Sequence, residues 1–297
     1  MRYKTASAFR TALESHLQAR SSQTGLSLVR LRKSVAFDRL LARLLVVAEG
    51  RWVLKGALAL DFRLGDKTRT TKDMDLVRQD DAAMATADFL EAQALDLGDY
   101  FSFVIEQTDQ LNALQDGAAI RCRARVELAG RTFEQIVIDI GFGNPLGWEP
   151  DLLAGSDLLT FAGIDAIQVP VLPLEQHVAE KVHAYTRAYG TGSMQSTRVK
   201  DLVDIVLIAG LATFSATHLR SAFAGTFAGR GLQALPSKLP LPPAEWSVPY
   251  RKLALTVGIN PDVERGHALA ASFLDPILGK TVNDEAHWDY VSQLWRV

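Results

Sequence analysis

Residues 55–76 read K-G-A-L-A-L-D-F-R-L-G-D-K-T-R-T-T-K-D-M-D-L, and the last four letters predict a β-strand with two carboxylates on one face. Residues two apart in a strand share a face, so Asp73 and Asp75 project together while Met74 and Leu76 face a core. Two like charges held side by side need a cation. Carboxylate oxygens suit Mg²⁺, with Mn²⁺ as the alternative metal. Such an ion keeps open coordination positions for substrate phosphates. An Asp-x-Asp pair also occurs by chance in loops and at strand ends.

The residues before the acidic pair are suited to a phosphate group. Gly56 precedes an apolar run that predicts a short helix, whose free N–H groups would face an anion. Hydroxyl and cationic side chains surround the acidic pair in the same segment, and such groups donate hydrogen bonds to phosphate oxygens. We therefore expect a triphosphate to bind here, at Lys55, Gly56, Arg69, Thr70 and Thr71.

A third carboxylate lies in a second predicted strand, F-E-Q-I-V-I-D-I-G-F-G, at residues 133–143. Its three isoleucines, at 136, 138 and 140, share one face, and Asp139 lies on the other. An acid in such an apolar strand is costly to bury unless it is paired or bound to metal. The alternative is that Asp139 faces solvent at a strand end, near a turn at Gly141, Gly143, Asn144 and Pro145.

Two metal ions held by three carboxylates would serve phosphoryl transfer. If the Asp139 strand lies beside the Asp73–Asp75 strand, the three side chains converge as metal ligands. One metal would then activate an attacking hydroxyl and the other would stabilise a leaving pyrophosphate. We expect Asp139 to be the ligand closest to the attacking hydroxyl.

Four blocks of the chain carry a resemblance to a known family. They are Gly56 with its apolar run, Arg69-x-Thr71-x-Asp73-x-Asp75, Asp139 in its strand, and the pair A-E-K-V-H-A-Y (179–185) and R-V-K-D-L-V-D-I (198–205). In this order they resemble the nucleotidyltransferase fold of the DNA polymerase β type, and more closely the AbiEii toxin family, which includes MenT-type toxins that act on tRNA. The resemblance implies Lys181 on a triphosphate and Asp201 as a supporting or catalytic acid.

The chain departs from the family pattern at two positions. The family commonly has two glycines after the lysine, whereas this chain has Gly56-Ala57, so only one position lacks a Cβ. Where relatives often have serine before the acidic pair, this chain has Thr71, which keeps a hydroxyl for phosphate contact or for phosphorylation by a partner.

The helical block can also be explained without a ligand. Val178, Val182 and Tyr185 form an apolar stripe on the first helix, and Leu202 and Ile205 begin another on the second. The structural alternative to a phosphate-binding Lys181 is a salt bridge that joins the two helices through their charged residues.

Taken together, the pattern of elements predicts an α+β fold. Residues 1–165 would form a nucleotidyltransferase catalytic domain, a mixed sheet flanked by helices, and residues 166–297 a mostly helical domain that closes the nucleotide cleft. The expected helices before residue 165 are 36–49, a short one after Gly56, and 80–94. The expected strands are those of the acidic pair, 101–106, 120–128 and 132–140, the last two joined by a turn at residues 129–131.

Composition limits the choice of partners and compartment. The 297 residues carry a formal net charge of −2, which argues against an extended nucleic-acid coat. Arg121, Arg123 and Arg125 alternate along a predicted strand, either as a track for RNA phosphates or as a solvated face, and Arg30, Arg32, Lys33, Arg39 and Arg43 are expected on a solvated helix. The single cysteine, Cys122, and the lack of an apolar leader or a membrane-length run indicate a cytoplasmic protein.

These observations favour a metal-dependent nucleotidyltransferase, and the resemblance implies that it is a toxin with a cognate antitoxin protein. It would transfer a nucleoside monophosphate from an NTP to RNA, and the resemblance implies the tRNA 3′ end as acceptor. The alternatives are nucleotidyl transfer to a protein or small molecule, and a non-catalytic NTP-binding module.

Overall fold

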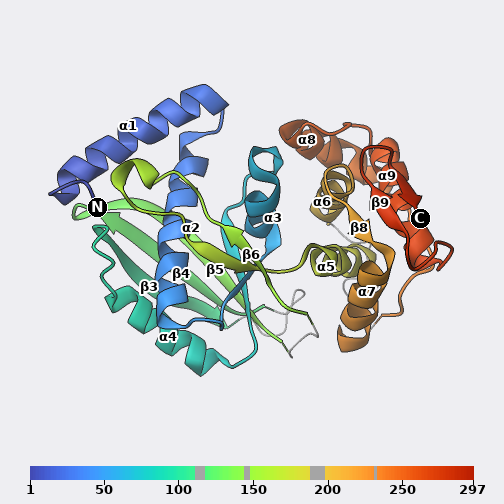
Figure 1. Cartoon of the computed structure of the whole chain (residues 1–297), viewed down its shortest axis with the longest axis horizontal. Helices are drawn as coiled ribbons and strands as arrows, with labels where there is room; N and C mark the ends of the chain where they lie inside the picture. Colours follow the sequence, from blue (N-terminus) through green and yellow to red (C-terminus); the bar gives the residue numbers. More distant parts are fainter. Residues whose placement is uncertain (111–117, 144–147, 188–197, 231–232) are drawn as a thin grey trace. The chain divides into compact units, whose positions relative to one another are not determined.

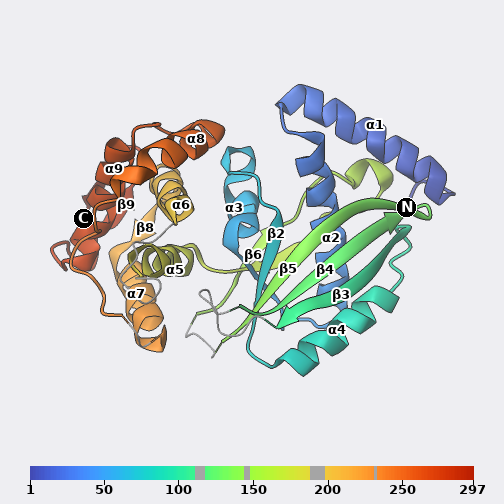
Figure 2. The same cartoon turned by 180° about the vertical axis from the view of Figure 1, so that it is seen from behind.

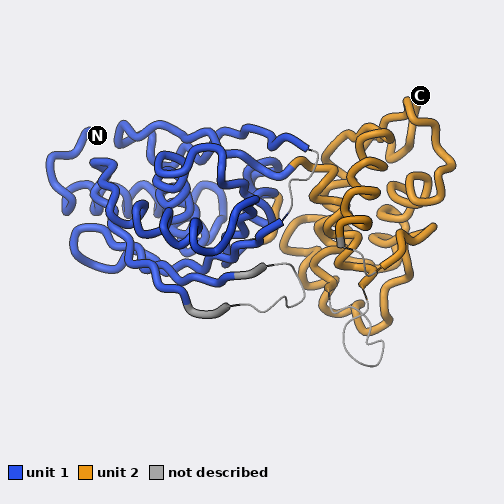
Figure 3. The backbone as a smooth tube through the Cα atoms, turned by 90° about the horizontal axis from the view of Figure 1, so that it is seen from below, with its two compact units in different colours: residues 1–66, 70–172 blue, residues 67–69, 173–297 orange. Residues whose placement is uncertain are grey.

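The computed structural model describes residues 1–110, 118–143, 148–187, 198–230 and 233–297. The chain divides into two compact units, which Figure 3 distinguishes by colour. Unit 1 comprises Met1–Asp66 and Thr70–Leu172, and unit 2 comprises Lys67–Arg69 and Pro173–Val297. The functional division expected at residue 165 stays a prediction, since these units are defined by contacts alone.

Unit 1 is built on a seven-stranded mixed sheet of order β3-β4-β5-β2-β1-β7-β6 (Figure 1). The pairs β2–β5 and β1–β7 are parallel, and the other neighbours are antiparallel. The strands are β1 (Val53–Lys55), β2 (Asp73–Arg78), β3 (Phe101–Gln110), β4 (Ala118–Leu128), β5 (Arg131–Phe142), β6 (Asp151–Ala154) and β7 (Gln168–Val171). The mixed sheet that the sequence predicts is confirmed.

The hairpin between β4 and β5 turns at Ala129 and Gly130, whose φ angles are 52° and 67°. Positive φ at both central residues matches the right-handed twist of the strands, as in type I′ turns. The hairpin expected at residues 129–131 is confirmed. Of the turn expected after β5, Asn144 and Pro145 lie outside the described residues.

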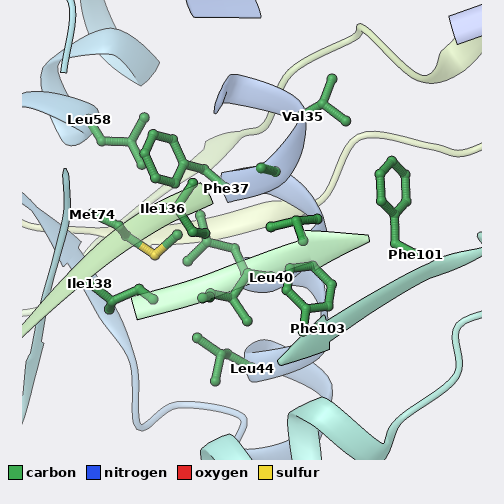
Figure 4. Close-up of a cluster of buried hydrophobic side chains, with 14 of the residues drawn as sticks. Val35, Phe37, Leu40, Leu44, Leu58, Met74, Phe101, Phe103, Ile136 and Ile138 are labelled. Carbon is green, nitrogen blue, oxygen red and sulfur yellow. The ribbon is translucent and has the colours of Figure 1, made fainter. Parts of the chain in front are cut away.

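Helices cover one face of this sheet. They are α1 (Ala6–Thr24), α2 (Leu28–Val47), α3 (Gly56–Leu64) and α4 (Ala82–Ala94), with short 3₁₀ segments at Gly65–Lys67 and Thr160–Ala162. Leu40 and Leu44 of α2 lie against Ile136 and Ile138 of β5 in the core (Figure 4). Figure 2 shows β3, β4 and β5 in front of α2, viewed from the side that the helices leave uncovered. The face of these strands that is turned away from α2 carries their polar side chains.

Two arginines of α2 are buried, although the sequence predicted them on a solvated helix face. Arg43 is 1% exposed and donates to both carboxylate oxygens of Asp99 at 3.0 and 2.7 Å. Arg39 is also buried, and it donates to Asp38 at 2.8 and 2.5 Å. The prediction was wrong because these cations are neutralised by carboxylates inside unit 1.

Unit 2 is mostly helical, as expected. Its helices are α5 (Leu174–Thr186), α6 (Val199–Ala209), α7 (Ala216–Arg230), α8 (Ser247–Val257) and α9 (Val263–Leu278), with a 3₁₀ turn at Ala244–Trp246. It also holds a small sheet that the sequence analysis missed, of order β10-β9-β8: β8 (Phe214–Ser215), β9 (His287–Asp289) and β10 (Leu294–Arg296). Strands of two or three residues are too short for a period-two pattern to reveal.

In the part of the chain that the structure describes, no helix has the length and apolar character needed to cross a lipid bilayer.

Candidate active site

The acidic pair lies on β2 as its sequence pattern predicts. Met74 and Leu76 are 0% exposed and belong to the core, while Asp73 and Asp75 alternate with them on the polar face. Thr71 donates its hydroxyl to the backbone carbonyl of Asp73 at 2.9 Å, just before the strand begins. Thr70, next to it, is exposed.

The strand of the third carboxylate runs parallel to β2 and directly beside it. Asp75 is opposite Asp139 in the register, and Asp73 is opposite Val137. Residues opposite each other on neighbouring strands point to the same face of a sheet. The backbone therefore brings Asp73, Asp75 and Asp139 to one face, which was the condition on which the predicted three-carboxylate site depended.

A row of four charges crosses the sheet at the level of Asp75. Lys55 on β1 is opposite Asp75, Asp75 is opposite Asp139, and Asp139 is opposite Arg121 on β4. Arg121 donates from Nε to Oδ1 of Asp139 and from Nη2 to Oδ2, both at 2.7 Å. Asp139 is therefore a paired acid, and not one that simply faces solvent at the end of its strand.

The donor set fits a hard divalent cation, because all three candidate ligands are carboxylates and hard cations prefer oxygen. The side chains are not gathered around a common point, however. Among the residues that the structure describes, no three His, Cys, Asp or Glu side chains are grouped as a metal centre requires. The pairing of Asp139 with Arg121 gives a physical reason, since both oxygens of that carboxylate are engaged by the guanidinium.

Asp75 lies so close to position 56 that only glycine, which has no Cβ, fits there without a collision. The φ of Gly56 is +68°, and a Cβ placed on it would lie 1.9 Å from Oδ2 and 2.7 Å from Cγ of Asp75. Helix α3 begins at this glycine, and Lys55 before it makes no side-chain cap. The first turn of α3 is thus placed beside the acidic pair, as an anion site next to a metal site would need.

The expected second cluster lies in unit 2 and joins two helices. Lys181 of α5 donates from Nζ to Asp204 of α6 at 2.6 Å and to Asp201 at 3.3 Å. Arg69 donates from Nε and Nη2 to the two oxygens of Asp204, each at 3.2 Å, and Arg198 donates to Asp201 at 3.3 Å. The salt bridge that the sequence offered as the structural alternative is present.

The charges in this cluster support one another. Burial would raise the pKa of Asp204, but Lys181 and Arg69 outweigh it and hold that pKa below its usual range. Burial would lower the pKa of Lys181, but Asp204 and Asp201 outweigh it and raise that pKa. Three cations and two carboxylates leave the cluster with a formal charge of +1, which suits an anion.

The predicted residues thus fall into two sets, one in each compact unit. Unit 1 holds Lys55, Gly56, Thr70, Thr71, Asp73, Asp75 and Asp139, and unit 2 holds Arg69, Lys181 and Asp201.

Asp204 was not among the predicted site residues, although the ion pairs centre on it and it is only 1% exposed. Its signal in the sequence was an acid within a run of otherwise apolar residues, L-V-D-I-V-L-I-A at 202–209.

The three alternating arginines of β4 share the polar face, but they are not equivalent. Arg121 is half-buried against Asp139, whereas Arg123 and Arg125 are exposed. Arg125 also pairs with Glu127 at 3.1 Å. Arg123 and Arg125 line a surface hollow of about 360 Å³ with Glu106 and Gln135.

A mixed sheet with alternating aspartates on one strand, a third aspartate on its parallel neighbour and a glycine-started helix against them defines a nucleotidyltransferase. Residues 39–268 match the family described as "Nucleotidyl transferase AbiEii toxin, Type IV TA system". The chain belongs to this family of nucleotidyltransferase toxins of type IV toxin–antitoxin systems, which confirms the family that its motifs indicated.

The chain is also similar to solved structures. MenT4, a nucleotidyltransferase toxin from Mycobacterium tuberculosis H37Rv, is 21% identical over 92% of this chain and 99% of its own, with a TM-score of 0.52. A candidate nucleotidyltransferase from H. pylori is 16% identical over 86% and 97%, with a TM-score of 0.46. JHP933 from Helicobacter pylori is 15% identical over 84% and 93%, with a TM-score of 0.43. No curated protein matches the sequence.

Proposed function

We propose that this toxin transfers a nucleoside monophosphate from an NTP to an RNA acceptor, the 3′ end of tRNA, in a reaction that depends on a divalent metal. The observation that carries the proposal is the register of β2 and β5, which places Asp75 opposite Asp139 and all three aspartates on one face. Three carboxylates on one face of neighbouring strands repel one another, and Lys55 and Arg121 offset only part of their negative charge, which favours binding of a divalent cation.

Asp73, Asp75 and Asp139 would hold Mg²⁺ or Mn²⁺. When bound, the metal supplies the charge that lowers the pKa of the attacking 3′-hydroxyl and stabilises the leaving pyrophosphate. Asp139 would be the carboxylate closest to that hydroxyl. In the transfer, the hydroxyl oxygen bonds to the α-phosphorus of the NTP while the bond from that phosphorus to pyrophosphate breaks, pyrophosphate leaves, and the hydroxyl proton is released to water.

The triphosphate would be bound by cations, hydroxyls and backbone N–H groups around the acidic pair and in the ion-pair cluster of unit 2. Gly56 lets the carboxylate of Asp75 lie against the start of α3, and Lys55, Thr70 and Thr71 flank the acidic pair. Arg69 and Lys181 would contribute positive charge, which Asp204 and Asp201 hold in place within unit 2. Asp201 would act as the supporting acid of this cluster.

The family match and the likeness to MenT4, a nucleotidyltransferase toxin, support nucleotidyl transfer by a toxin of this fold. The tRNA acceptor rests on the resemblance of the sequence motifs to MenT-type toxins that act on tRNA. A cognate antitoxin is the partner that the family implies. We place the reaction in the cytoplasm, where NTPs and tRNA are available. Arg123 and Arg125, which are exposed on the polar face, are the residues of the arginine set that could contact RNA phosphates.

The test incubates the purified protein with Mg²⁺, total tRNA and each α-labelled NTP in turn. Label on RNA that disappears with EDTA and falls about 10²–10³-fold in Asp73→Asn, the range for losing one electrostatic contact to a transition state, would support the proposal. The Asp73 carboxylate has no hydrogen bond or ion pair among the described residues, so the variant should fold normally. Label on protein or a small molecule, or NTP binding without turnover, would favour the alternatives.

A further inference from the structure

The carboxylate that is proposed as the third metal ligand already has a cationic partner. Both oxygens of Asp139 accept a hydrogen bond from Arg121, and the two N–H groups form a parallel fork. The Asp139 side chain is 14% exposed and that of Arg121 is 39% exposed, so the pair is partly open to solvent on the polar face. A metal ion cannot coordinate Asp139 through the lone pairs that accept these two hydrogen bonds while Arg121 is in place.

The charge balance of the polar face explains why a cation is needed at this position. Asp75 and Asp139 are in register on neighbouring strands, where like charges destabilise a sheet. Lys55 and Arg121 flank them on the outer strands of the same row. With Asp73 included, the five side chains carry a formal charge of −1, whereas any one cation fewer would leave −2.

We infer that Arg121 is a resident counter-cation of Asp139, which competes with the divalent metal and must leave that carboxylate when the metal binds. The inference rests on the proposed function, because it assumes that Asp139 is a metal ligand. It assigns Arg121 a role distinct from the RNA track: it sets how tightly the toxin holds its metal, and so makes metal occupancy depend on the metal concentration around the protein.

Neighbouring arginines provide matched controls for this inference. Arg123 has the same charge, strand and face, but it is opposite Val137. Arg125 is opposite Gln135, and its guanidinium pairs with Glu127. Removing the charge of Arg123 or Arg125 would change the electrostatic potential at the metal site without removing a partner of Asp139. Removing Arg121 would change that potential and would also remove the partner of Asp139.

The experiment titrates Mn²⁺ into the protein without nucleotide or RNA and follows free Mn²⁺ by electron paramagnetic resonance. Ionic strength near 0.15 M limits the effect of distant charges, because the screening length there is about 8 Å. Wild type is compared with Arg121→Gln, Arg121→Lys, Arg123→Gln and Asp139→Asn. Circular dichroism establishes that each variant is folded, and Arg121→Lys serves if the glutamine variant is not.

We expect Arg121→Gln to bind Mn²⁺ about tenfold more tightly than wild type, a change equal to about 1.4 kcal/mol. Arg121→Lys should also bind more tightly than wild type, because an ammonium lacks the planar fork. Arg123→Gln should change the affinity by about twofold or less, since a screened charge acts weakly.

Two different failures can be told apart. If wild type binds Mn²⁺ and loses it in Asp139→Asn, but Arg121→Gln binds no better than wild type or Arg123→Gln, the competition is refuted and the metal site stands. If Asp139→Asn binds Mn²⁺ as wild type does, or if neither wild type nor Arg121→Gln binds it, Asp139 is no ligand and the proposed site fails together with this inference.

Discussion

Replacing Gly56 by alanine should reduce nucleotidyl transfer strongly, because the new methyl group would displace the carboxylate of Asp75. The new Cβ would lie 1.9 Å from Oδ2 of Asp75, and an ordinary contact needs 3.4 Å or more, so the carboxylate must move by about 1.5 Å. A misplacement of about 1 Å at a catalytic group can cost about 10²-fold in rate. The left-handed backbone adds a strain of about 1–2 kcal/mol for a residue with a Cβ.

We therefore expect Gly56→Ala to lose about 100-fold in nucleotidyl transfer and about 2–3 kcal/mol in the free energy of unfolding, from the backbone strain together with about 1 kcal/mol for disturbed contacts of Asp75. The assays are label transfer to RNA and urea unfolding followed by circular dichroism.

The control is Gly25→Ala. Gly25 has a φ of +75°, and a Cβ there meets nothing within 4 Å. That variant shares the backbone strain but not the collision, so it should unfold more easily while keeping its activity. If Gly56→Ala retains as much activity as Gly25→Ala, Gly56 does not position Asp75 for catalysis.

Three further predictions concern the ion pairs and the arginines. Asp204→Asn should lose about 3–5 kcal/mol in the free energy of unfolding, because it leaves the buried Lys181 without its nearest partner. Asp201→Asn, which removes the more distant partner, should lose less. Equal losses in urea unfolding would contradict the central place of Asp204 in the cluster. The lowered pKa of Asp204 stabilises the fold above the unfolded-state value of about 3.9, and this contribution is lost as pH falls through the folded-state pKa. The stability gap between wild type and Asp204→Asn should therefore be widest at pH 7 and narrow below about pH 4, and a gap unchanged at pH 3 would count against the ion pair. Arg123→Glu with Arg125→Glu should weaken tRNA binding in a filter assay by about tenfold per lost phosphate contact and leave NTP binding unchanged, whereas unaltered tRNA binding would show a merely solvated face.

The alternation of residues was sufficient to predict the elements that carry the aspartates. Met74, Leu76 and the three isoleucines of β5 mark the buried face of each strand, so the positions of Asp73, Asp75 and Asp139 on the opposite face followed directly. The parallel pairing of β2 with β5 could only be stated as a condition, because a short period-two pattern does not specify which strands become neighbours.

The Arg121–Asp139 pair could not be predicted from the hairpin. Counting back from the turn, where Leu128 is opposite Arg131, an even ladder would place Arg121 opposite Ile138. The register shifts by one residue between Val126 and Glu127, and this irregularity brings Arg121 to Asp139. The extra residue is Phe133 of β5, and it interrupts the alternation there, because Phe133 and Ile136 are both buried although they are three apart.

Buried ion pairs were the other source of error. Arg43 looked like a surface cation because its partner, Asp99, is 56 residues away in sequence. Asp204 was overlooked in favour of Asp201 for a similar reason, since the partners Lys181 and Arg69 come from distant segments. Charges whose partners lie far along the chain cannot be assigned to core or surface by local periodicity.

The row of Lys55, Asp75, Asp139 and Arg121 has a consequence for how the chain folds. Each residue comes from a different strand, and a slip of any strand by one position would turn its charge into the apolar layer beneath the sheet. Such a misaligned sheet would bury an uncompensated charge, at a cost of several kcal/mol. The catalytic charges therefore also specify strand alignment, and a variant that neutralises the row is expected to lose folding fidelity together with chemistry.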